Sequence, residues 1–311
     1  MSNLAVDESK PIPIVCGPTA SGKTGIAVEL SDTFPIEVVS ADSRQLVRHL
    51  EIGTAKPTAE ERQAVPIHLI DLIEPGERYT AFRFIDDATE VIRAVLARDR
   101  IPVVVGGTGL YLRALTEGVV EIDSDDMHVR EELEVQMEQL GPERMHERLA
   151  QVDPLEAAVI HPNNKIRVIR ALEMFYLTGK SKSELVVTEA YKTTPFRFRY
   201  FCLMPPREEL YQIINTRVDQ MMEQGLLAEI QALTNRGMKD QIIAANVIGY
   251  KELLEHLDNR LTEEEAVSLI KQNTRRYAKR QVTWFRKLDP GDVYGTRERL
   301  IDALAAYLAT L

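Results

Sequence analysis

Short runs of apolar, mostly β-branched residues alternate with longer segments of helical periodicity in the first part of the chain. The runs predict strands at Ile12–Cys16, Ile36–Ser40, His68–Asp71 and Pro102–Val105. The segments between them predict helices at Lys23–Thr33, Phe82–Arg98 and Leu110–Thr116. This alternation is typical of a parallel sheet flanked by helices, so we expect an α/β fold.

The pattern changes near Asp123, where the β-branched runs end. Polar segments with helical periodicity, separated by Gly-Pro, Asp-Pro and His-Pro pairs, then continue to about Thr194. Strand composition returns at Phe196–Met204, and the remainder is mainly helical. Breaks in that remainder are expected near Gly237, Asp258 and Pro290-Gly291. We expect a core of residues 10–121 and 196–311 and a mainly helical insertion domain at 122–195.

The composition is that of a folded globular protein, with 44% apolar and 28% charged residues in 311. Cys16 and Cys202 lie inside apolar runs without metal-ligand spacing, so we expect buried thiols in a reducing compartment. No apolar stretch reaches the roughly 18–20 residues that span a bilayer, and MSNLAVDESK lacks the regions of a signal peptide. We expect a cytoplasmic protein, a monomer, with no membrane partner.

Charge is unevenly distributed along the chain. The net charge is −10, yet the stretch from Ala266 to Leu288 has seven Lys/Arg residues and no Asp or Glu. Within it, Arg275 and Lys279 stand four residues apart, a like-charge spacing that destabilises an isolated helix. This pattern indicates an anionic partner, although a solvated helix face has the same appearance.

The strongest local signal is a phosphate-binding loop between the first expected strand and helix. It fits G-x-x-x-x-G-K-[ST] and consists of Gly17, Pro18, Thr19, Ala20, Ser21, Gly22, Lys23 and Thr24. Glycines let successive N–H groups point inward at an anion, and the helix dipole adds positive potential. The lysine supplies a mobile cation, and the hydroxyl of Thr24 is a candidate ligand of Mg²⁺. The sequence therefore predicts a phosphate site.

Two further residues follow strands that end at the same edge of the sheet. Asp42 comes just after the second strand and Thr108 just after Pro102–Val105. Strand carboxyl ends line the ligand crevice of such sheets, so Asp42 is a candidate for metal binding or general-base catalysis. Both residues also fit helix-cap or turn roles. Asp71 is a weak candidate for holding Mg²⁺, because strands that end in Asp are common.

Eight segments in order resemble the tRNA dimethylallyltransferase (tRNA isopentenyltransferase) family over nearly the whole chain. They are GPTASGKT at 17–24, SADSRQ at 40–45, IGTAKPT at 52–58, HLIDL at 68–72, VVVGGTGLYLRAL at 103–115, HPNNKIRVIRALE at 161–173, VIGYKEL at 247–253 and RRYAKRQVTWFRK at 275–287. The zinc finger of animal and yeast members has no counterpart here, so the bacterial type fits better.

The resemblance implies transfer of a dimethylallyl group from dimethylallyl diphosphate to N6 of the adenosine 3′ to the anticodon in tRNA. It assigns the diphosphate to the P-loop and Arg217, with Mg²⁺ as cofactor, general-base catalysis to Asp42, and catalytic roles to Thr108 and Lys23. Contact with the tRNA anticodon stem-loop is assigned to Asp42, Ser43, Arg44, Gln45, Thr108, Arg130, Ile166, Arg167, Val168, Ile169 and Arg170. The basic run adds Arg275, Lys279 and Arg280.

Three other functions share parts of this pattern. An isopentenyltransferase acting on free adenine nucleotides would need the same diphosphate loop. A P-loop kinase would transfer phosphate from ATP and usually carries an arginine-rich lid, whereas the insertion here is net acidic. A nucleotide-switched RNA-binding protein would use the loop without chemistry.

Overall fold

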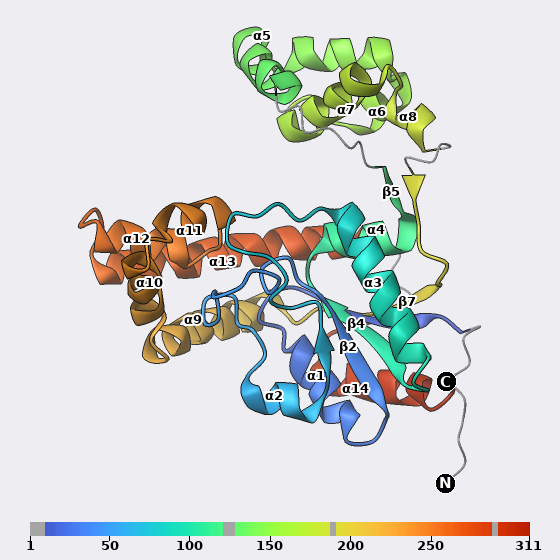
Figure 1. Ribbon diagram of the computed structural model, residues 1–311, viewed down its shortest axis with the longest axis vertical. Coiled ribbons are helices and arrows are strands. Elements are labelled where there is room, and N and C mark those ends of the chain that lie inside the picture. The colour runs from blue at the N-terminus through green and yellow to red at the C-terminus, as the bar shows by residue number, and fades with distance from the viewer. Residues whose placement is uncertain (1–9, 121–127, 187–190, 288–291) are drawn as a thin grey trace. The chain divides into compact units, whose positions relative to one another are not determined.

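The computed structural model describes residues 10–120, 128–186, 191–287 and 292–311 (Figure 1). The chain divides into two compact units, Met1–Thr116 with Pro195–Leu311, and Glu117–Thr194. We call them the core unit and the insertion unit. The sequence placed the insertion at 122–195; residue 122 and the expected break at Pro290-Gly291 lie outside the described residues.

The core unit is built on a six-stranded sheet in the order β3-β2-β4-β1-β7-β8, and all of its strand pairs are parallel. In chain order the strands are β1 (Ile12–Cys16), β2 (Ile36–Ala41), β3 (Ile67–His68), β4 (Ile101–Gly106), β7 (Phe198–Leu203) and β8 (Val293–Tyr294). The predicted parallel sheet is confirmed, and the buried thiols of Cys16 and Cys202 lie beside each other on β1 and β7.

Two strands differ from the sequence prediction. The strand expected at His68–Asp71 is only Ile67–His68, because Leu69 and Asp71 have φ of 60° and 56°, which an extended strand does not adopt. Strand β8 was not predicted, since two residues carry no detectable periodicity.

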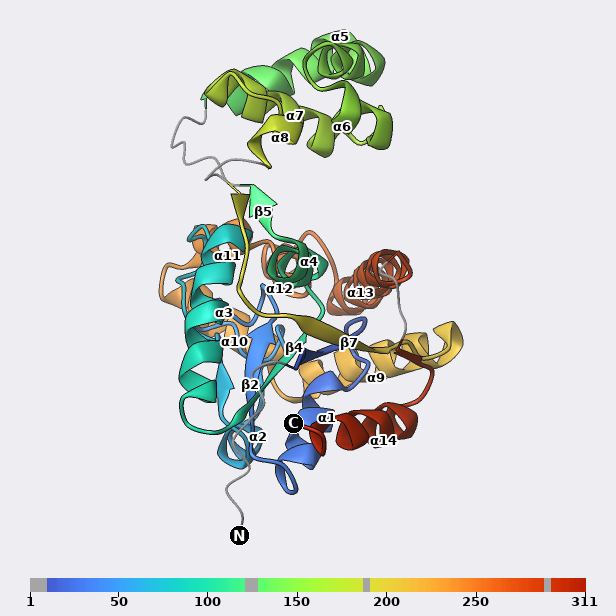
Figure 2. The same cartoon turned by 90° about the vertical axis from the view of Figure 1, so that its right-hand side faces the viewer.

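Helices cover both faces of the sheet, as Figure 2 shows. Helices α1 (Lys23–Ser31) and α14 (Arg297–Leu308) pack on one face, where alternate strand residues such as Val103 and Val105 share a buried cluster with them. Helix α3 (Ala81–Leu96) packs on β2 and β4. Its apolar stripe includes Phe84, whose ring stacks on Tyr111.

The rest of the core unit is helical. These helices are α2 (Ala59–Ala64), α4 (Gly109–Glu117), α9 (Arg207–Glu223), α10 (Leu226–Asn235), α11 (Lys239–Ala245), α12 (Tyr250–Leu257) and α13 (Glu263–Phe285). The predicted breaks at Gly237 and Asp258 are confirmed, because Gly237 separates α10 from α11 and Asp258 caps the end of α12. Helix α13 packs against α9 and α12.

The insertion unit is mainly helical, as the sequence predicted. Its helices are α5 (His128–Val152), α6 (Pro154–Val159), α7 (Lys165–Thr178) and α8 (Lys182–Leu185). Helix α5 is interrupted at Gly141, where φ is 81° just before Pro142. An antiparallel pair, β5 (Val119–Val120) and β6 (Tyr191–Lys192), joins the first and last parts of the unit. Among the described residues, no helix is both long and apolar enough to cross a membrane.

Candidate active site

A cavity of about 1250 Å³ opens at the carboxyl ends of strands β1, β2 and β4. Five P-loop residues line it: Thr19, Ala20, Gly22, Lys23 and Thr24. Asp42, Gln45 and Arg217 line the same cavity, so residues far apart in the sequence meet there. Position at the strand ends is where ligands bind in open α/β sheets.

The P-loop requires glycine at its first position. A Cβ on Gly17 would lie 2.4 Å from the carbonyl oxygen of Leu203 on the neighbouring strand, and its φ of 152° disfavours a side chain. The loop is closed by internal bonds: Ser21 Oγ donates to the carbonyl of Pro18 at 2.9 Å, and Lys23 Nζ donates to the same carbonyl at 2.7 Å. The Lys23 side chain thus crosses the loop, and Lys23 lines the cavity.

Two cations, Lys23 and Arg217, and the carboxylate of Asp42 lie close enough in this cavity to affect one another. Burial lowers the pKa of Lys23 to about 8; the negative charge of Asp42 opposes that shift and the positive charge of Arg217 adds to it. Burial also lowers the pKa of Arg217, against the attraction of Asp42 and Glu61. Both cations therefore lie in surroundings that penalise their charge. A polyanion bound between them would relieve this cost.

Asp42 lies in a turn that is hydrogen-bonded to Thr108 of the neighbouring loop. Asp42 Oδ1 accepts a hydrogen bond of 2.9 Å from the backbone N–H of Arg44. The N–H of Ser43 donates to Thr108 Oγ1 at 2.9 Å. Thr108 is not among the residues that line the cavity. Its contact with Ser43 sets the backbone that presents the Asp42 carboxylate.

The other residues of this turn contact distant segments. Gln45 Nε2 donates to the carbonyl of Ala55 at 3.0 Å, and Arg44 Nη1 donates to the carbonyl of Ala245 at 2.8 Å. These bonds tie the turn to the loop before α2 and to the end of α11.

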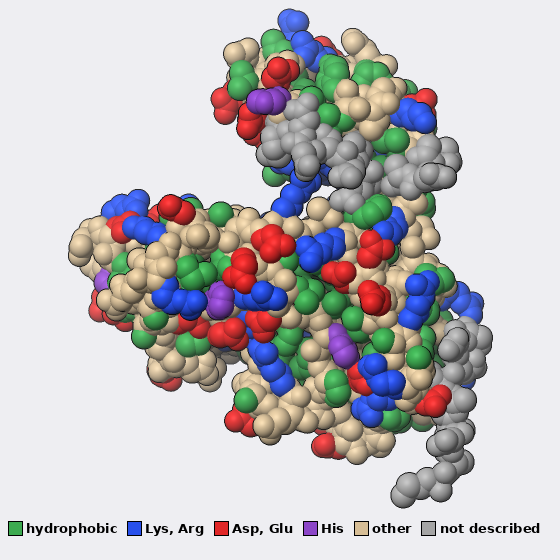
Figure 3. Space-filling view, in the orientation of Figure 1, with side chains coloured by type: hydrophobic (Ala, Val, Ile, Leu, Met, Phe, Trp, Pro, Cys, Tyr) green, Lys and Arg blue, Asp and Glu red, His purple; other side chains and the backbone are tan. Residues whose placement is uncertain are grey.

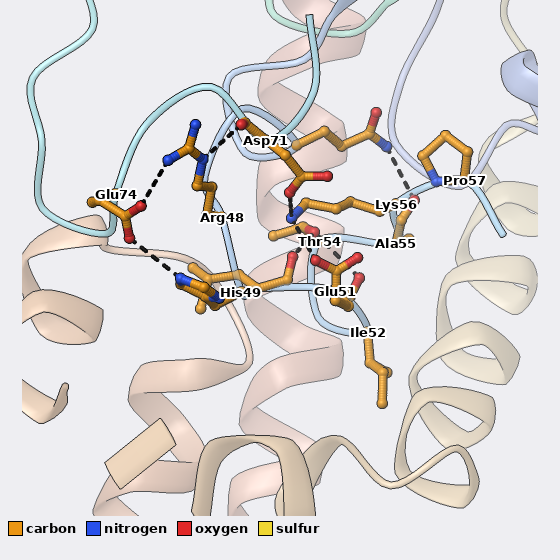
Figure 4. A network of polar contacts seen from close by, with 12 residues as sticks. Arg48, His49, Glu51, Ile52, Thr54, Ala55, Lys56, Pro57, Asp71 and Glu74 are labelled. Carbon is orange, nitrogen blue, oxygen red and sulfur yellow. Dashed lines mark hydrogen bonds and ion pairs between the residues drawn. The ribbon is translucent and has the colours of Figure 1, made fainter. Parts of the chain in front are cut away.

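Residues 51–62 form one wall of the cavity, and an ion network that sequence reasoning missed holds them in place (Figure 4). The Lys56 side chain is only 1% exposed and pairs with Glu51 at 2.8 Å and with Asp71. Arg62 pairs with Asp71 at 3.2 Å. Asp71 thus pairs with two cations and does not line the cavity, and its part in Mg²⁺ binding stays a prediction.

Gln281 of α13 is another residue of the site that the sequence analysis did not identify. It is buried, lines the cavity, and contacts both the P-loop and Gly107. Three residues later, Trp284 packs on the backbone of Gly109, where a Cβ would lie 2.5 Å from its ring. Phe285 is buried and Trp284 is partly buried. Within RRYAKRQVTWFRK, the one signal for such a role is that Gln281 is the single side-chain amide of the segment.

The proposed tRNA contacts differ in their exposure. On α13, Lys279 and Arg280 are exposed, and Arg275 donates a hydrogen bond to Asn215. In the insertion unit, Arg130 pairs with Glu134 and Arg170 with Glu173. Ile166 and Arg167 are exposed on α7, and Arg167 also pairs with Glu156 at 3.4 Å. The inclusion of Val168 and Ile169 is wrong for their side chains, which are buried in the core of that unit. A five-residue contact stretch cannot lie wholly on one helix face.

Acidic and basic side chains are interspersed over the face of the core unit seen in Figure 3. Many of them form pairs, such as Arg48 with Glu74 at 3.0 Å. Among the described residues, no group of three or more His, Cys, Asp or Glu side chains is arranged to hold a metal.

Comparison with known proteins gives the same assignment at the level of the family. A family model described as IPP transferase matches residues 45–288, and one described as Isopentenyl transferase matches residues 11–71. The chain is 45% identical over 284 residues to tRNA dimethylallyltransferase 1 of Syntrophotalea carbinolica, covering 91% of this chain and 90% of that protein. It is 44% identical over 281 residues to tRNA dimethylallyltransferase of Geobacter metallireducens, covering 90% and 91%.

Comparison with solved structures points to the same family. The full-length tRNA isopentenylpyrophosphate transferase of Bacillus halodurans superposes with a TM-score of 0.68 at 40% identity, covering 98% of this chain and 96% of that one. A eukaryotic dimethylallyltransferase acting on tRNA gives a TM-score of 0.77 at 31% identity, covering 96% and 77%. From the extent of these matches and the cavity just described, the chain belongs to the IPP transferase family.

Proposed function

We propose that this protein transfers a dimethylallyl group from dimethylallyl diphosphate to N6 of the adenosine 3′-adjacent to the anticodon of a tRNA, and releases diphosphate. The observation that carries the proposal is that the P-loop, Arg217 and Asp42 line the same cavity. It pairs a binding site for a leaving polyanion with a carboxylate base, which are the two groups that prenyl transfer to an amine requires.

The reaction breaks the bond between the allylic carbon and the diphosphate oxygen, whose electrons stay on the leaving group. Lys23, Arg217 and the inward N–H groups of the P-loop stabilise that growing charge. The adenine N6 lone pair forms the new C–N bond, and Asp42 takes the proton that N6 loses. Because the allylic cation is delocalised, placing the amine near it does much of the catalytic work.

Mg²⁺ is the cofactor that we propose for this site. Mg²⁺ usually binds through one or two protein oxygens together with substrate phosphates and water, and the lack of a protein cage among the described residues fits that mode. Thr24 lines the cavity and would hold the ion. When bound, it supplies further neutralisation of the diphosphate.

The RNA partner would contact α13 and the insertion unit. The exposed side chains of Lys279 and Arg280 on α13, and of Arg167 on α7, are suited to phosphates. Ser43, Arg44 and Gln45 lie next to Asp42, where the target nucleotide would enter. An adenine in a single-stranded loop leaves its stack at low cost, which favours an anticodon loop over a duplex.

Incubation of the protein with labelled dimethylallyl diphosphate tests the proposal. We expect label in unmodified tRNA and in an anticodon stem-loop, and none when guanosine replaces the adenosine 3′ to the anticodon. Labelling of free AMP, ADP or ATP but not of tRNA would instead identify an isopentenyltransferase of free nucleotides. Phosphate transfer from ATP to a small acceptor would identify a kinase.

A further inference from the structure

The side-chain amide of Gln281 joins two loops that are far apart in the sequence. Its Oε1 accepts a hydrogen bond of 2.8 Å from the backbone N–H of Thr19, and its Nε2 donates one of 2.9 Å to the carbonyl of Gly107. A backbone N–H only donates and a carbonyl only accepts, so the amide has a single possible orientation. Gln281 as a residue is 7% exposed, so water cannot easily replace the amide as the partner of either group.

One of the two loops would bind the prenyl donor, and the other positions the base that accepts the proton. Thr19 lies in the P-loop after β1, which would hold the diphosphate of the donor. Gly107 immediately precedes Thr108, which fixes Ser43 beside the base Asp42. Strands β1 and β4 are neighbours, but their pairing ends at Cys16 and Gly106, just before these loops. Beyond that point, Gln281 supplies the link from one loop to the other.

The Gln281 amide approaches the backbone of Gly107 closely. A Cβ on Gly107 would lie 2.6 Å from Gln281 Nε2 and 3.1 Å from the carbonyl oxygen of Gly17. The glycine therefore permits the close approach on which the bond to its carbonyl depends.

We propose that Gln281 is a positioning residue for prenyl transfer, whose amide fixes the P-loop at the distance from the Thr108 loop at which donor and base meet. The inference rests on the proposed function. Reactions of this kind are sensitive to displacements of about 1 Å, which are within reach when one hydrogen-bonded link is lost. A residue that acts in this way changes donor binding and turnover and leaves tRNA binding intact.

The test uses Gln281→Met, which keeps the volume and removes both hydrogen bonds, and Gln281→Glu, which keeps the acceptor for Thr19 but places a carboxylate against the Gly107 carbonyl. Gln272→Met and Gln272→Glu are matched controls, because Gln272 is an exposed residue of the same helix. The measurements are melting temperature, KM and kcat for dimethylallyl diphosphate, KM for an anticodon stem-loop, and calorimetric affinity for inorganic diphosphate.

We expect both Gln281 variants to remain folded, with KM for the donor raised about tenfold and kcat lowered. Gln281→Met leaves the Thr19 N–H and the Gly107 carbonyl without partners, and Gln281→Glu sets a carboxylate against the Gly107 carbonyl, so each variant breaks the link between the loops. Affinity for inorganic diphosphate should fall by about the same factor, and KM for the stem-loop should stay within about twofold of the wild type. The Gln272 variants should match the wild type in every measurement.

Folded Gln281 variants whose donor KM, kcat and diphosphate affinity equal those of the Gln272 controls would overturn the proposal. A lower melting temperature with unchanged diphosphate affinity would also overturn it, because it would show a purely structural bond. The diphosphate titration needs neither tRNA nor turnover. If the wild-type protein failed to label tRNA, the proposed function would fall while the titration still decided whether Gln281 shapes the P-loop.

Discussion

Thr108 Oγ1 accepts a hydrogen bond of 2.9 Å from the backbone N–H of Ser43, the residue that follows Asp42. The contact joins the loop after β4 to the turn after β2, so the orientation of the Asp42 carboxylate depends on a hydroxyl in another segment. The resemblance to the family assigned Thr108 a catalytic role and a contact with the tRNA. In this structure its hydroxyl also holds the backbone of Ser43 in place.

Replacement of Thr108 by Val should therefore slow prenyl transfer by about tenfold, the factor that corresponds to about 1.4 kcal/mol. Valine keeps the shape but leaves the Ser43 N–H without its acceptor. Steady-state kcat with a stem-loop substrate measures the effect. Thr108→Ser retains the hydroxyl and should stay near the wild-type rate. Equal rates for the Val and Ser variants would mean that the bond to Ser43 does not matter for turnover.

Asp42→Asn should lower kcat by at least ~10²-fold, the scale of a lost general base, because an amide cannot take the N6 proton. Binding of tRNA, followed by fluorescence anisotropy, should be largely retained. Asp302→Asn on α14 makes the same change at an exposed site and should leave both quantities unaltered. Full activity in the Asp42 variant would remove this residue from its assigned role.

Lys23 predicts a pH dependence of diphosphate binding. Its pKa in the free protein is about 8, so the ammonium is lost as pH rises through that value, and affinity for diphosphate should fall in the same range. A bound anion favours the charged form, so binding near pH 8.5 should be accompanied by proton uptake. Calorimetry in buffers of different ionisation enthalpy measures that uptake. Lys23→Arg keeps its charge and should bind without it; identical proton uptake in both proteins would assign the proton to another group.

Glu37 predicts the acid stability of the core unit. Its side chain is 5% exposed and pairs with Arg98 and His68 at 2.7 Å and with Arg100 at 2.9 Å. Burial alone would raise the pKa of this carboxyl, but hydrogen bonds from Arg98 and His68 outweigh it and lower the pKa below its ordinary 4.5. The stabilisation is therefore fully present above about pH 4.5 and is lost as pH falls through the lower folded-state pKa.

Glu37→Gln should lower the free energy of unfolding at pH 7 by about 1–3 kcal/mol, because charged hydrogen bonds are lost. Denaturant titration at pH 7 and at pH 3 measures the difference, which should shrink at the lower pH. Glu90→Gln, an exposed change on α3, is the control. A difference that persisted undiminished at pH 3 would rule out ionisation of Glu37 as its source.

Most of the core sheet could be predicted from the sequence because its strands are buried on both faces and are therefore continuous apolar runs, as in IPIVC and PVVVG. The P-loop and Asp42 were found for a related reason, since each directly follows such a run. Strand β8 was missed because two residues have no periodicity, and the end of β3 was misplaced because Leu69 and Asp71 turn into left-handed backbone.

The part of the site that the sequence did not predict consists of side-chain contacts that depend on the folded path of the chain. Lys56 looks like an ordinary charged residue until the chain brings Glu51 and Asp71 to its amine. Gln281 is equally unremarkable in sequence, and its partners lie more than 170 positions away. The local sequence pattern predicts the secondary structure of a segment, whereas the roles of Lys56 and Gln281 depend on which segments come into contact in the fold.

The sheet has its earliest strand, β1, in its interior, flanked by β4 and by the late strand β7, while the final helix, α14, packs against α1. A nascent chain that has just left the ribosome with its P-loop therefore lacks the neighbours of that loop. The hydrogen bond between the N–H of Thr19 and Gln281 forms only after α13 has been synthesised. Fragments that stop before α13 should carry the diagnostic glycine motif and still fail to retain diphosphate.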